Sequence, residues 1–182
     1  MVNTKSSLQE KSIVFIGFMG VGKTTIGQLV AKKLFRTFID IDKEIENIYQ
    51  MPTTQIFKTI GEKAFREKEK SLISQFSSQK LKIISVGGGA FLQKEVRDIC
   101  LANCVVIYLD MSWESWKERL NILIDSRPIL QGLSLKEIEE LFYKRQESYS
   151  VHHSKLTIDN LEIEYIVDYL IDSLKLAWEF DK

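Results

Sequence analysis

Short apolar runs alternate along the chain with longer stretches in which apolar residues recur every three or four positions. The apolar runs predict strands near residues 12–16, 38–41, 82–86, 104–109 and 156–158. The helical spacing predicts helices that begin near Lys23, Asp42, Glu62, Gln93, Trp113 and Ser134, with a last one that ends near Trp178. Strands that alternate with helices favour a parallel sheet covered on both faces, because parallel strands need long crossovers. We therefore expect an α/β fold with a five-stranded parallel sheet.

Polar residues and breakers predict where several of the helices begin. Ser112 is placed to cap a helix that carries Trp113, Trp116 and Leu120. Pro52 stops one helix, and Thr53 or Thr54 is placed to cap the next, before Gly61 interrupts the pattern. An irregular stretch at 121–132 precedes the helix at 134–149.

The length of 182 residues favours one domain, which we place at residues 12–182 after a flexible terminus at 1–11. Hydrophobic residues make up 45% of the chain and charged residues 27%, which is typical of a folded, soluble protein. No apolar run approaches the roughly 20 residues needed to cross a bilayer. The first eleven residues are polar and lack the pattern of a secretion signal, so we expect a cytoplasmic location.

Charge and cysteine usage narrow the range of partners. The chain has 25 basic and 25 acidic residues, so no net field would draw it to nucleic acid or to an anionic membrane. Cys100 and Cys104 lack the Cys and His neighbours of a zinc site, and we expect buried reduced thiols. Trp113, Trp116 and Trp178 are expected to be packing residues, because a nucleic-acid platform needs interleaved basic residues.

The segment from Gly17 to Thr24, G-F-M-G-V-G-K-T, follows a predicted strand and opens a predicted helix, as the phosphate-binding P-loop requires. Its backbone N–H groups would surround the phosphates, Lys23 would reach the β- and γ-phosphates, and the Thr24 hydroxyl would face Mg²⁺. A glycine turn that only joins a strand to a helix is the alternative. The residues expected to bind ATP in this segment are Gly20, Val21, Gly22, Lys23, Thr24 and Thr25.

The P-loop alone does not name a reaction, because motors, switches and kinases share it. The chain has no N-K-x-D segment of the kind that reads guanine, and no acidic strand end typical of motor ATPases. The strand at 82–86 is followed instead by Gly87, Gly88 and Gly89.

Six blocks in order give a more specific resemblance. They are Gly17–Thr25, Phe38-Ile39-Asp40-Ile41-Asp42, Gly61-Glu62-Lys63-Ala64-Phe65-Arg66, Gly87-Gly88-Gly89, Arg127-Pro128-Ile129-Leu130, and Arg145 with Tyr149. Together they span nearly the whole chain, and the chain resembles the shikimate kinases. The resemblance implies a nucleoside-monophosphate-kinase-like fold and a monomer that transfers phosphate from MgATP to the 3-hydroxyl of shikimate, on the pathway to chorismate and the aromatic amino acids. It also implies substrate-binding helices at about 42–77 and a lid at about 119–132.

The resemblance assigns the acceptor site to residues whose chemistry fits an acidic polyol. Arg66 and Arg145 resemble the family's pair that binds the carboxylate, and arginine suits this role because its planar fork makes two parallel hydrogen bonds. Taken singly, such arginines are more often solvated helix residues. Asp42 resembles the residue that accepts hydrogen bonds from the substrate hydroxyls and orients or deprotonates the attacking one. The turn at Gly87, Gly88 and Gly89 would lie against the substrate ring; otherwise it is a tight connection.

The remaining assignments concern the nucleotide. Asp40, two residues before Asp42 and expected on the same strand face, resembles the group that holds Mg²⁺ together with Thr24; the alternative is a capping aspartate. Arg127 resembles the lid arginine that neutralises the transferring phosphoryl group and excludes water, and with Lys23 and Asp42 it completes the expected catalytic set. Arg119 would stack on adenine or form a surface salt bridge.

Three points stay open in the sequence. The lid segment at 121–126 has fewer basic and glycine residues than the family pattern. His152 and His153 depart from that pattern, and we expect a structural role for them rather than metal binding. The alternative functions are a related kinase acting on gluconate or a nucleoside monophosphate, and a nucleotide-binding module that has lost catalysis.

Overall fold

The computed structural model describes residues 7–123 and 128–181, and its centre is a five-stranded sheet in which every strand pair is parallel. The strand order is β2-β3-β1-β4-β5. The strands are β1 (Ile13–Ile16), β2 (Thr37–Asp40), β3 (Lys82–Ser85), β4 (Val105–Asp110) and β5 (Ser154–Thr157). The predicted α/β fold is confirmed, and strand ends differ from the prediction by one or two residues.

The central strand is apolar throughout because it is covered on both faces. All residues of β1 are buried, and Ile13 pairs with Ile83 on one side and with Val105 on the other. A run without alternation is typical of such a strand. At the edges the pattern changes: Ser154, Lys155 and Thr157 in β5 are exposed.

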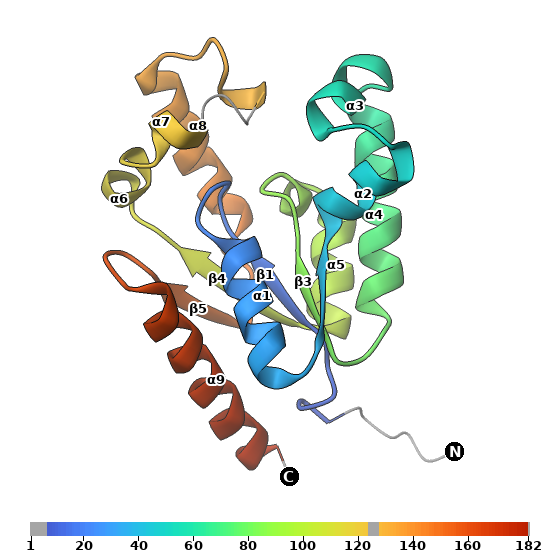
Figure 1. Ribbon diagram of the computed structural model, residues 1–182, viewed down its shortest axis with the longest axis vertical. Coiled ribbons are helices and arrows are strands. Elements are labelled where there is room, and N and C mark those ends of the chain that lie inside the picture. Colours follow the sequence, from blue (N-terminus) through green and yellow to red (C-terminus); the bar gives the residue numbers. More distant parts are fainter. Residues whose placement is uncertain (1–6, 124–127, 182) are drawn as a thin grey trace.

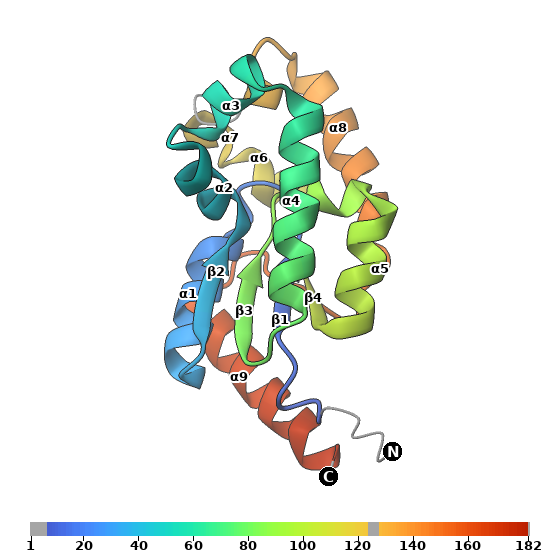
Figure 2. The same cartoon turned by 90° about the vertical axis from the view of Figure 1, so that its right-hand side faces the viewer.

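Helices cover both faces of the sheet (Figures 1 and 2). Helices α1 and α9 contact each other on one face, and α4 and α5 contact each other on the opposite face. Their bounds are α1 (Lys23–Leu34), α2 (Ile41–Tyr49), α3 (Thr53–Thr59), α4 (Glu62–Ser77), α5 (Lys94–Asn103), α6 (Trp113–Lys117), α7 (Leu120–Leu123), α8 (Leu135–Ser148) and α9 (Ile163–Phe180). Two short 3₁₀ helices are η1 (Ala90–Leu92) and η3 (Pro128–Leu130).

Two groups of elements stand above the carboxyl ends of the strands. Figure 1 shows α2, α3 and the upper part of α4 on one side of the loop before α1, and α6, α7 and α8 on the other. Ligands of open parallel sheets bind at this edge. The fold therefore places the P-loop between two helical walls.

Two of the predicted helix boundaries are wrong. Ser112 does cap α6 by accepting a hydrogen bond from the Ser115 N–H, but α6 ends at Lys117 and Leu120 begins a separate helix, α7. The N-cap of α3 is Pro52, so neither Thr53 nor Thr54 caps it. The Thr53 N–H is satisfied instead by the carboxylate of Glu46, at 2.8 Å.

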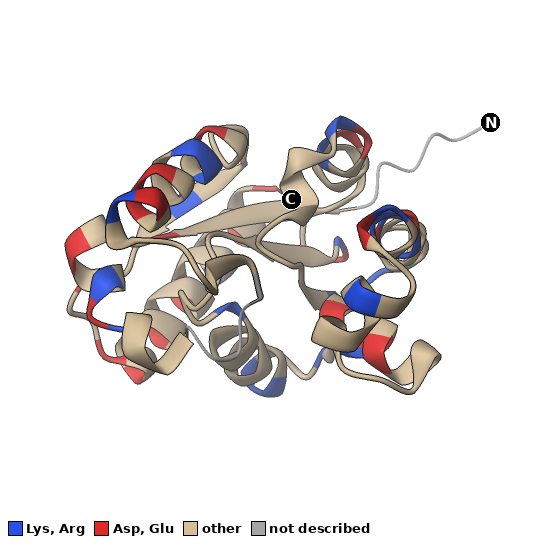
Figure 3. Cartoon of the chain, turned by 90° about the horizontal axis from the view of Figure 1, so that it is seen from above, with Lys and Arg blue, Asp and Glu red and all other residues tan. Residues whose placement is uncertain are grey.

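Other features of the described chain bear on the sequence predictions. Cys100 and Cys104 are buried free thiols, as predicted. Lys11 forms an isolated bridge with Lys80, so this part of the N-terminal segment touches the domain. Figure 3 shows basic and acidic positions interspersed on the same helices. None of the helices in the described residues is long and apolar enough to cross a membrane.

Candidate active site

The loop between β1 and α1 borders a cavity of about 250 Å³. Gly17, Gly20 and Gly22 all have positive φ angles, of 145°, 78° and 102°, which side chains other than glycine rarely adopt. The cavity is lined by Met19, Gly20, Gly22, Lys23, Thr24, Thr25, Asp40, Asp42, Ser85, Val86, Gly87 and Gly88. The geometry is that of a phosphate cradle at a helix N-terminus.

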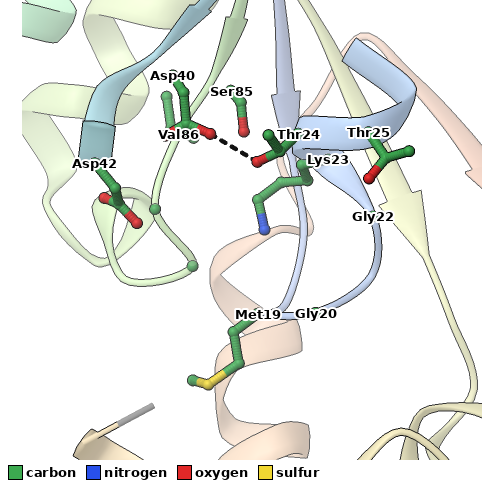
Figure 4. A pocket seen from close by; sticks show the side chains of 12 residues that line it. Met19, Gly20, Gly22, Lys23, Thr24, Thr25, Asp40, Asp42, Ser85 and Val86 are labelled. Carbon is green, nitrogen blue, oxygen red and sulfur yellow. Dashed lines mark hydrogen bonds between the residues drawn. The ribbon is translucent and has the colours of Figure 1, made fainter. Parts of the chain in front are cut away.

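Lys23 folds back over this loop. Its side chain is largely buried, and Nζ donates hydrogen bonds to the carbonyls of Gly17 at 2.8 Å and Phe18 at 2.9 Å. Figure 4 shows the ammonium group extending from α1 toward the loop, while Asp42 extends into the same cavity from α2. A cation held at this point faces any anion that the loop binds.

Asp40 caps α2 and also contacts Thr24. Its Oδ2 accepts a hydrogen bond from the Thr24 hydroxyl at 2.6 Å, and its Oδ1 accepts one from the Lys43 N–H at 3.2 Å, which caps α2. The expectation that Asp42 shares a strand face with Asp40 is wrong, because β2 ends at Asp40 and Asp42 lies in the first turn of α2. The strong helical pattern of residues 41–49 begins immediately at the strand end, so the turn of the helix separates the two carboxylates.

The oxygen pair of Thr24 and Asp40 fits a hard divalent cation. A hydroxyl and a carboxylate are ligands that Mg²⁺ accepts, and Mg²⁺ in kinases takes most of its other ligands from water and phosphate. Within the described residues no group of three or more His, Cys, Asp or Glu side chains could form a closed metal cage. The donor set therefore suits a metal that arrives with the nucleotide.

A second cavity, of about 330 Å³, adjoins the first. The two share Met19, Asp42, Gly87 and Gly88. The rest of the second cavity is lined by Thr53, Phe57, Glu62, Phe65, Arg66, Glu69, Gly89, Ile129 and Arg145. Two aromatic rings and two guanidinium groups thus face a space that opens toward Lys23.

The two arginines converge over Gly89. A Cβ on that glycine would lie 2.6 Å from Arg66 Nη2 and 3.0 Å from Arg145 Nη1. Arg145 Nη1 is buried and has no hydrogen-bond partner among the described residues. Burial lowers the pKa of Arg145, whereas Glu69 and Glu62 raise the pKa of Arg66 despite its burial. Burying a cation with an unsatisfied N–H donor costs free energy unless an anion accepts a hydrogen bond from that donor.

Glu69 is a part of this cavity that the sequence analysis did not identify. The residue is fully buried, and its Oε2 accepts hydrogen bonds from Arg66 Nη1 at 2.8 Å and Gln93 Nε2 at 3.0 Å. Burial raises its pKa to about 7, against the opposing effect of Arg66. The helical spacing of Phe65, Glu69 and Leu72 places all three on the buried face of α4, and this periodicity could have found it.

Tyr149 connects helix α8 to the glycine turn. Its ring is buried, and its hydroxyl donates a hydrogen bond to the Gly88 carbonyl. Gly88 also lies close to the P-loop, since a Cβ there would approach the Met19 nitrogen to 3.1 Å. The turn is therefore held between the phosphate cradle and α8.

Aromatic side chains support the P-loop from the opposite wall. Trp116 Nε1 donates to the Met19 carbonyl at 2.7 Å, and the Phe18 ring lies 4.9 Å from the Trp116 ring and 5.0 Å from the Phe142 ring. Trp116 is fully buried and Trp113 nearly so, which confirms them as packing residues. Trp178 is partly buried and packs against the core.

Of the two arginines in the predicted lid, the structure describes Arg119 but not Arg127. Arg119 is exposed and its Nη1 donates to the Gly20 carbonyl at 3.0 Å, so it lies at the edge of the P-loop. Arg127 lies outside the described residues.

The two adjacent histidines make structural contacts. His153 Nδ1 accepts a hydrogen bond from the Val106 N–H at 3.0 Å, and His152 Nδ1 donates to the Tyr149 carbonyl at 2.7 Å. Burial lowers the pKa of His153, which favours the neutral ring that such an acceptor requires.

Comparison with known proteins gives a consistent match. A family model described as shikimate kinase matches residues 19–175. The chain is 55% identical to the shikimate kinase of Oceanobacillus iheyensis, over 96% of each chain. Among solved structures, the shikimate kinase of Bacteroides thetaiotaomicron has a TM-score of 0.82 at 31% identity, covering 91% of this chain and 98% of the other. The shikimate kinase of Acinetobacter baumannii in complex with shikimate has a TM-score of 0.81 at 26% identity, covering 92% and 94%.

Proposed function

The chain belongs to the shikimate kinase family, and from this premise we propose how its residues catalyse ATP-dependent phosphorylation of shikimate. The observation that carries the proposal is the convergence of two guanidinium groups over Gly89, in a cavity that adjoins the cradle around Lys23. An acidic polyol placed there has its carboxylate at one end and a hydroxyl beside the nucleotide. The reaction is transfer of the γ-phosphoryl group to the 3-hydroxyl, giving shikimate 3-phosphate and ADP.

Arg66 and Arg145 bind the acceptor's carboxylate. Arg145 Nη1, which is buried and has no hydrogen-bond partner in the part of the chain that the structure describes, supplies one donor, and Arg66 Nη2 approaches the same point. Charge-assisted hydrogen bonds of this kind are stronger than neutral ones and fix orientation as well as affinity. Phe57 and Phe65 border the same cavity and would pack against the ring, while Gly87, Gly88 and Gly89 let it approach the backbone closely.

Asp42 orients the attacking hydroxyl. Its carboxylate lines both cavities and is therefore placed at their junction. The hydroxyl oxygen forms a bond to the γ-phosphorus, the bond from phosphorus to the oxygen bridging the β- and γ-phosphates breaks, and Asp42 takes the hydroxyl proton. Most of the rate acceleration comes from positioning and electrostatic stabilisation.

Lys23 holds negative charge that develops on the transferred group and on ADP. Thr24 and Asp40 are the residues that would hold Mg²⁺, which would supply charge neutralisation on the phosphate oxygens when bound. The residues of the P-loop from Gly20 to Thr25 bind the phosphates, and Arg119 borders the same nucleotide site. Arg127 is proposed as the lid arginine that closes over the phosphoryl group.

The domain roles and the setting follow from the same proposal. Helices within about 42–77 bind the acceptor, and the segment at about 119–132 forms the lid. We propose a cytoplasmic monomer that binds ATP and shikimate without nucleic acid or membrane. The buried free thiols and the equal numbers of basic and acidic residues, 25 each, support this setting.

The test measures ADP formation at fixed MgATP while the shikimate concentration is varied. Arg66→Ala removes one of the two guanidinium groups that bind the carboxylate, so the KM for shikimate should rise about 10- to 100-fold while the KM for ATP changes little. Lys63→Ala is the matched control, because Lys63 is an exposed cation on the same helix. An unchanged KM for shikimate in Arg66→Ala would refute the acceptor site.

Further measurements test the role of Lys23 and separate the alternative functions. Lys23→Met should abolish turnover. Turnover with gluconate or a nucleoside monophosphate in place of shikimate would instead indicate a different acceptor. ATP binding without turnover with any acceptor would indicate a module that has lost catalysis.

A further inference from the structure

Glu69 is a buried carboxylate in the wall of the second cavity, which the proposed function assigns to the acceptor. It is 0% exposed, and one of its oxygens, Oε1, has no hydrogen-bond partner among the described residues. That oxygen is directed toward the glycine turn, since a Cβ on Gly87 would lie 2.9 Å from it. The carboxylate oxygen Oδ1 of Asp42 would lie 2.8 Å from the same point. The carboxylates of Asp42 and Glu69 therefore approach the same side of Gly87, at the wall of this cavity.

Glu69 depends on one cation for most of its charge balance. Its salt bridge with Arg66 is 2.8 Å long, and Gln93 adds a neutral donor to the same oxygen. The charged and titratable groups around it are Arg66 and Glu62 on α4, Asp42 on α2, and Arg145 and Tyr149 at the end of α8. Arg145 interacts with Glu69 but has no hydrogen bond to it in the described structure.

Binding of the acceptor changes this balance. The proposed function directs the acceptor's carboxylate to Arg66 and Arg145, which adds a negative charge beside a group that already faces Asp42. A like charge disfavours ionisation of a carboxylate, and so does competition for its cation. The acceptor also excludes water from the cavity, which strengthens both effects.

We propose that binding of shikimate is coupled to the uptake of one proton by Glu69, so that Arg66 is released from a carboxylate of the protein to the carboxylate of the acceptor. The proton comes from the solvent and adds to Oε1, the oxygen for which residues 7–123 and 128–181 provide no hydrogen-bond partner. The neutral carboxyl group keeps Oε2 as an acceptor for Gln93. Glu69 is in this sense a positioning residue, because it acts on the acceptor through Arg66.

The pKa of Glu69 lies in a pH range in which proton uptake on binding can be measured. Burial raises its pKa to about 7, so at pH 7 roughly half of the free enzyme carries the proton. Uptake at that pH therefore cannot exceed about half a proton per acceptor bound. At pH 8.5 the free enzyme is mostly ionised, and the uptake on binding depends on how far the acceptor raises the pKa.

The experiment is calorimetric titration of the enzyme with shikimate at pH 7, in PIPES and in imidazole at the same ionic strength. The two buffers release protons with different enthalpies, so the difference in observed binding enthalpy gives the number of protons taken up. We expect an uptake of up to about half a proton. We also expect the affinity to fall by up to about tenfold between pH 6 and pH 8.5, the change that one unit of pKa shift produces.

Two variants locate the proton. Glu69→Gln keeps the shape and the acceptor oxygen for Gln93 but cannot titrate, so its binding should exchange no proton. Glu62→Gln is the matched control, because Glu62 pairs with the same arginine at 3.4 Å but its side chain is 68% exposed. This variant should keep the proton uptake of the unmodified enzyme. Circular dichroism checks that both variants fold, and the measurement on the unmodified enzyme stands without them.

The possible failures are distinguishable. If the enzyme binds shikimate with no proton exchange, or if Glu69→Gln takes up as much as the unmodified enzyme, the coupling is wrong and the acceptor site stands. If Arg66→Ala leaves shikimate affinity unchanged, the acceptor site itself is wrong and the coupling falls with it.

Discussion

At the scale of single residues, the acceptor cavity depends on the absence of side chains at Gly87 and Gly89. The space in which a Cβ of residue 89 would lie is already close to both guanidinium groups, and the space at residue 87 is close to both carboxylates. The turn therefore brings two cations and two anions around a short stretch of bare backbone. Any side chain there displaces the groups that bind the acceptor.

Substitution of Gly89 by alanine tests this reading. The new Cβ would lie 2.6 Å from Arg66 Nη2 and 3.0 Å from Arg145 Nη1, so the flexible guanidinium ends must move apart. We expect the KM for shikimate to rise at least about tenfold, because the two guanidinium groups can no longer converge on one carboxylate. The KM for ATP, measured in the same assay, serves as the internal control. A larger effect on ATP than on shikimate would contradict the assignment of this turn.

The sequence predicted the roles of Arg66 and Arg145, but it did not reveal Glu69, the buried acid that pairs with Arg66. Arg66 and Arg145 stand out only because they belong to ordered blocks, since a lone arginine on a helix is ordinarily solvated. Glu69 lies in the strongly charged segment Glu62–Lys70, where only its helical spacing with Phe65 and Leu72 distinguishes it from the exposed acids. Its burial depends on packing against Gln93 and the glycine turn, which are distant in sequence.

At the scale of elements, hydrophobic periodicity located the strands and most of the helices. The errors fall at helix boundaries, where the local sequence is compatible with more than one backbone conformation. Ser112 correctly predicts a helix start, but nothing in the periodic pattern of Trp113, Trp116 and Leu120 shows that α6 ends at Lys117. Likewise Asp42 lies in a helix because α2 starts directly at the strand end, where the capping carboxylate of Asp40 accepts from Lys43.

Helix α8 is joined to the acceptor site through its last turn, and Tyr149→Phe tests the connection. The substitution removes the hydroxyl that donates to the Gly88 carbonyl and keeps the ring, whose centroid lies 5.4 Å from that of Tyr108. We expect the KM for shikimate to rise about 3- to 10-fold, with a loss of stability of about 1 kcal/mol. Both are measurable, by steady-state kinetics and by denaturant unfolding.

The control is Tyr143→Phe, which removes a hydroxyl from an exposed tyrosine on the same helix. It should change neither quantity. A Tyr149→Phe enzyme that loses stability but keeps its KM for shikimate would show that the hydroxyl supports the fold without positioning the glycine turn.

At the scale of the whole molecule, alternation of strands and helices predicts a parallel sheet but not the order of its strands. The order β2-β3-β1-β4-β5 is fixed by contacts between segments far apart in the chain, such as the pairing of Ile13 with Val105. This order places the ends of β1, β2 and β3 side by side, and with them Lys23, Asp40 and the glycine turn. The topology explains why these residues, which the family blocks single out, lie close together.

A buried acid whose pKa is raised should also be visible in the stability of the whole molecule. The pKa of Glu69 rises from 4.5 to about 7 on folding, so the folded state binds this proton more tightly than the unfolded state does. Its contribution to stability is fully present below pH 4.5 and is lost as the pH rises through 7. A shift of this size corresponds to a loss on the order of 3 kcal/mol.

Glu69→Gln removes this loss, so the variant should gain stability relative to the unmodified protein as the pH rises from 5 to 8. The other titrating groups are common to both proteins, and the difference in their free energies of unfolding isolates residue 69. Urea unfolding at the two pH values measures it without adding ionic strength. Glu62→Gln, which changes an exposed acid that pairs with the same arginine, is measured in the same way as the matched control. If the difference in free energy of unfolding between Glu69→Gln and the unmodified protein were the same at pH 5 and pH 8, the pKa of Glu69 would not change on folding. The proposal that Glu69 takes up a proton on acceptor binding would then lose its basis.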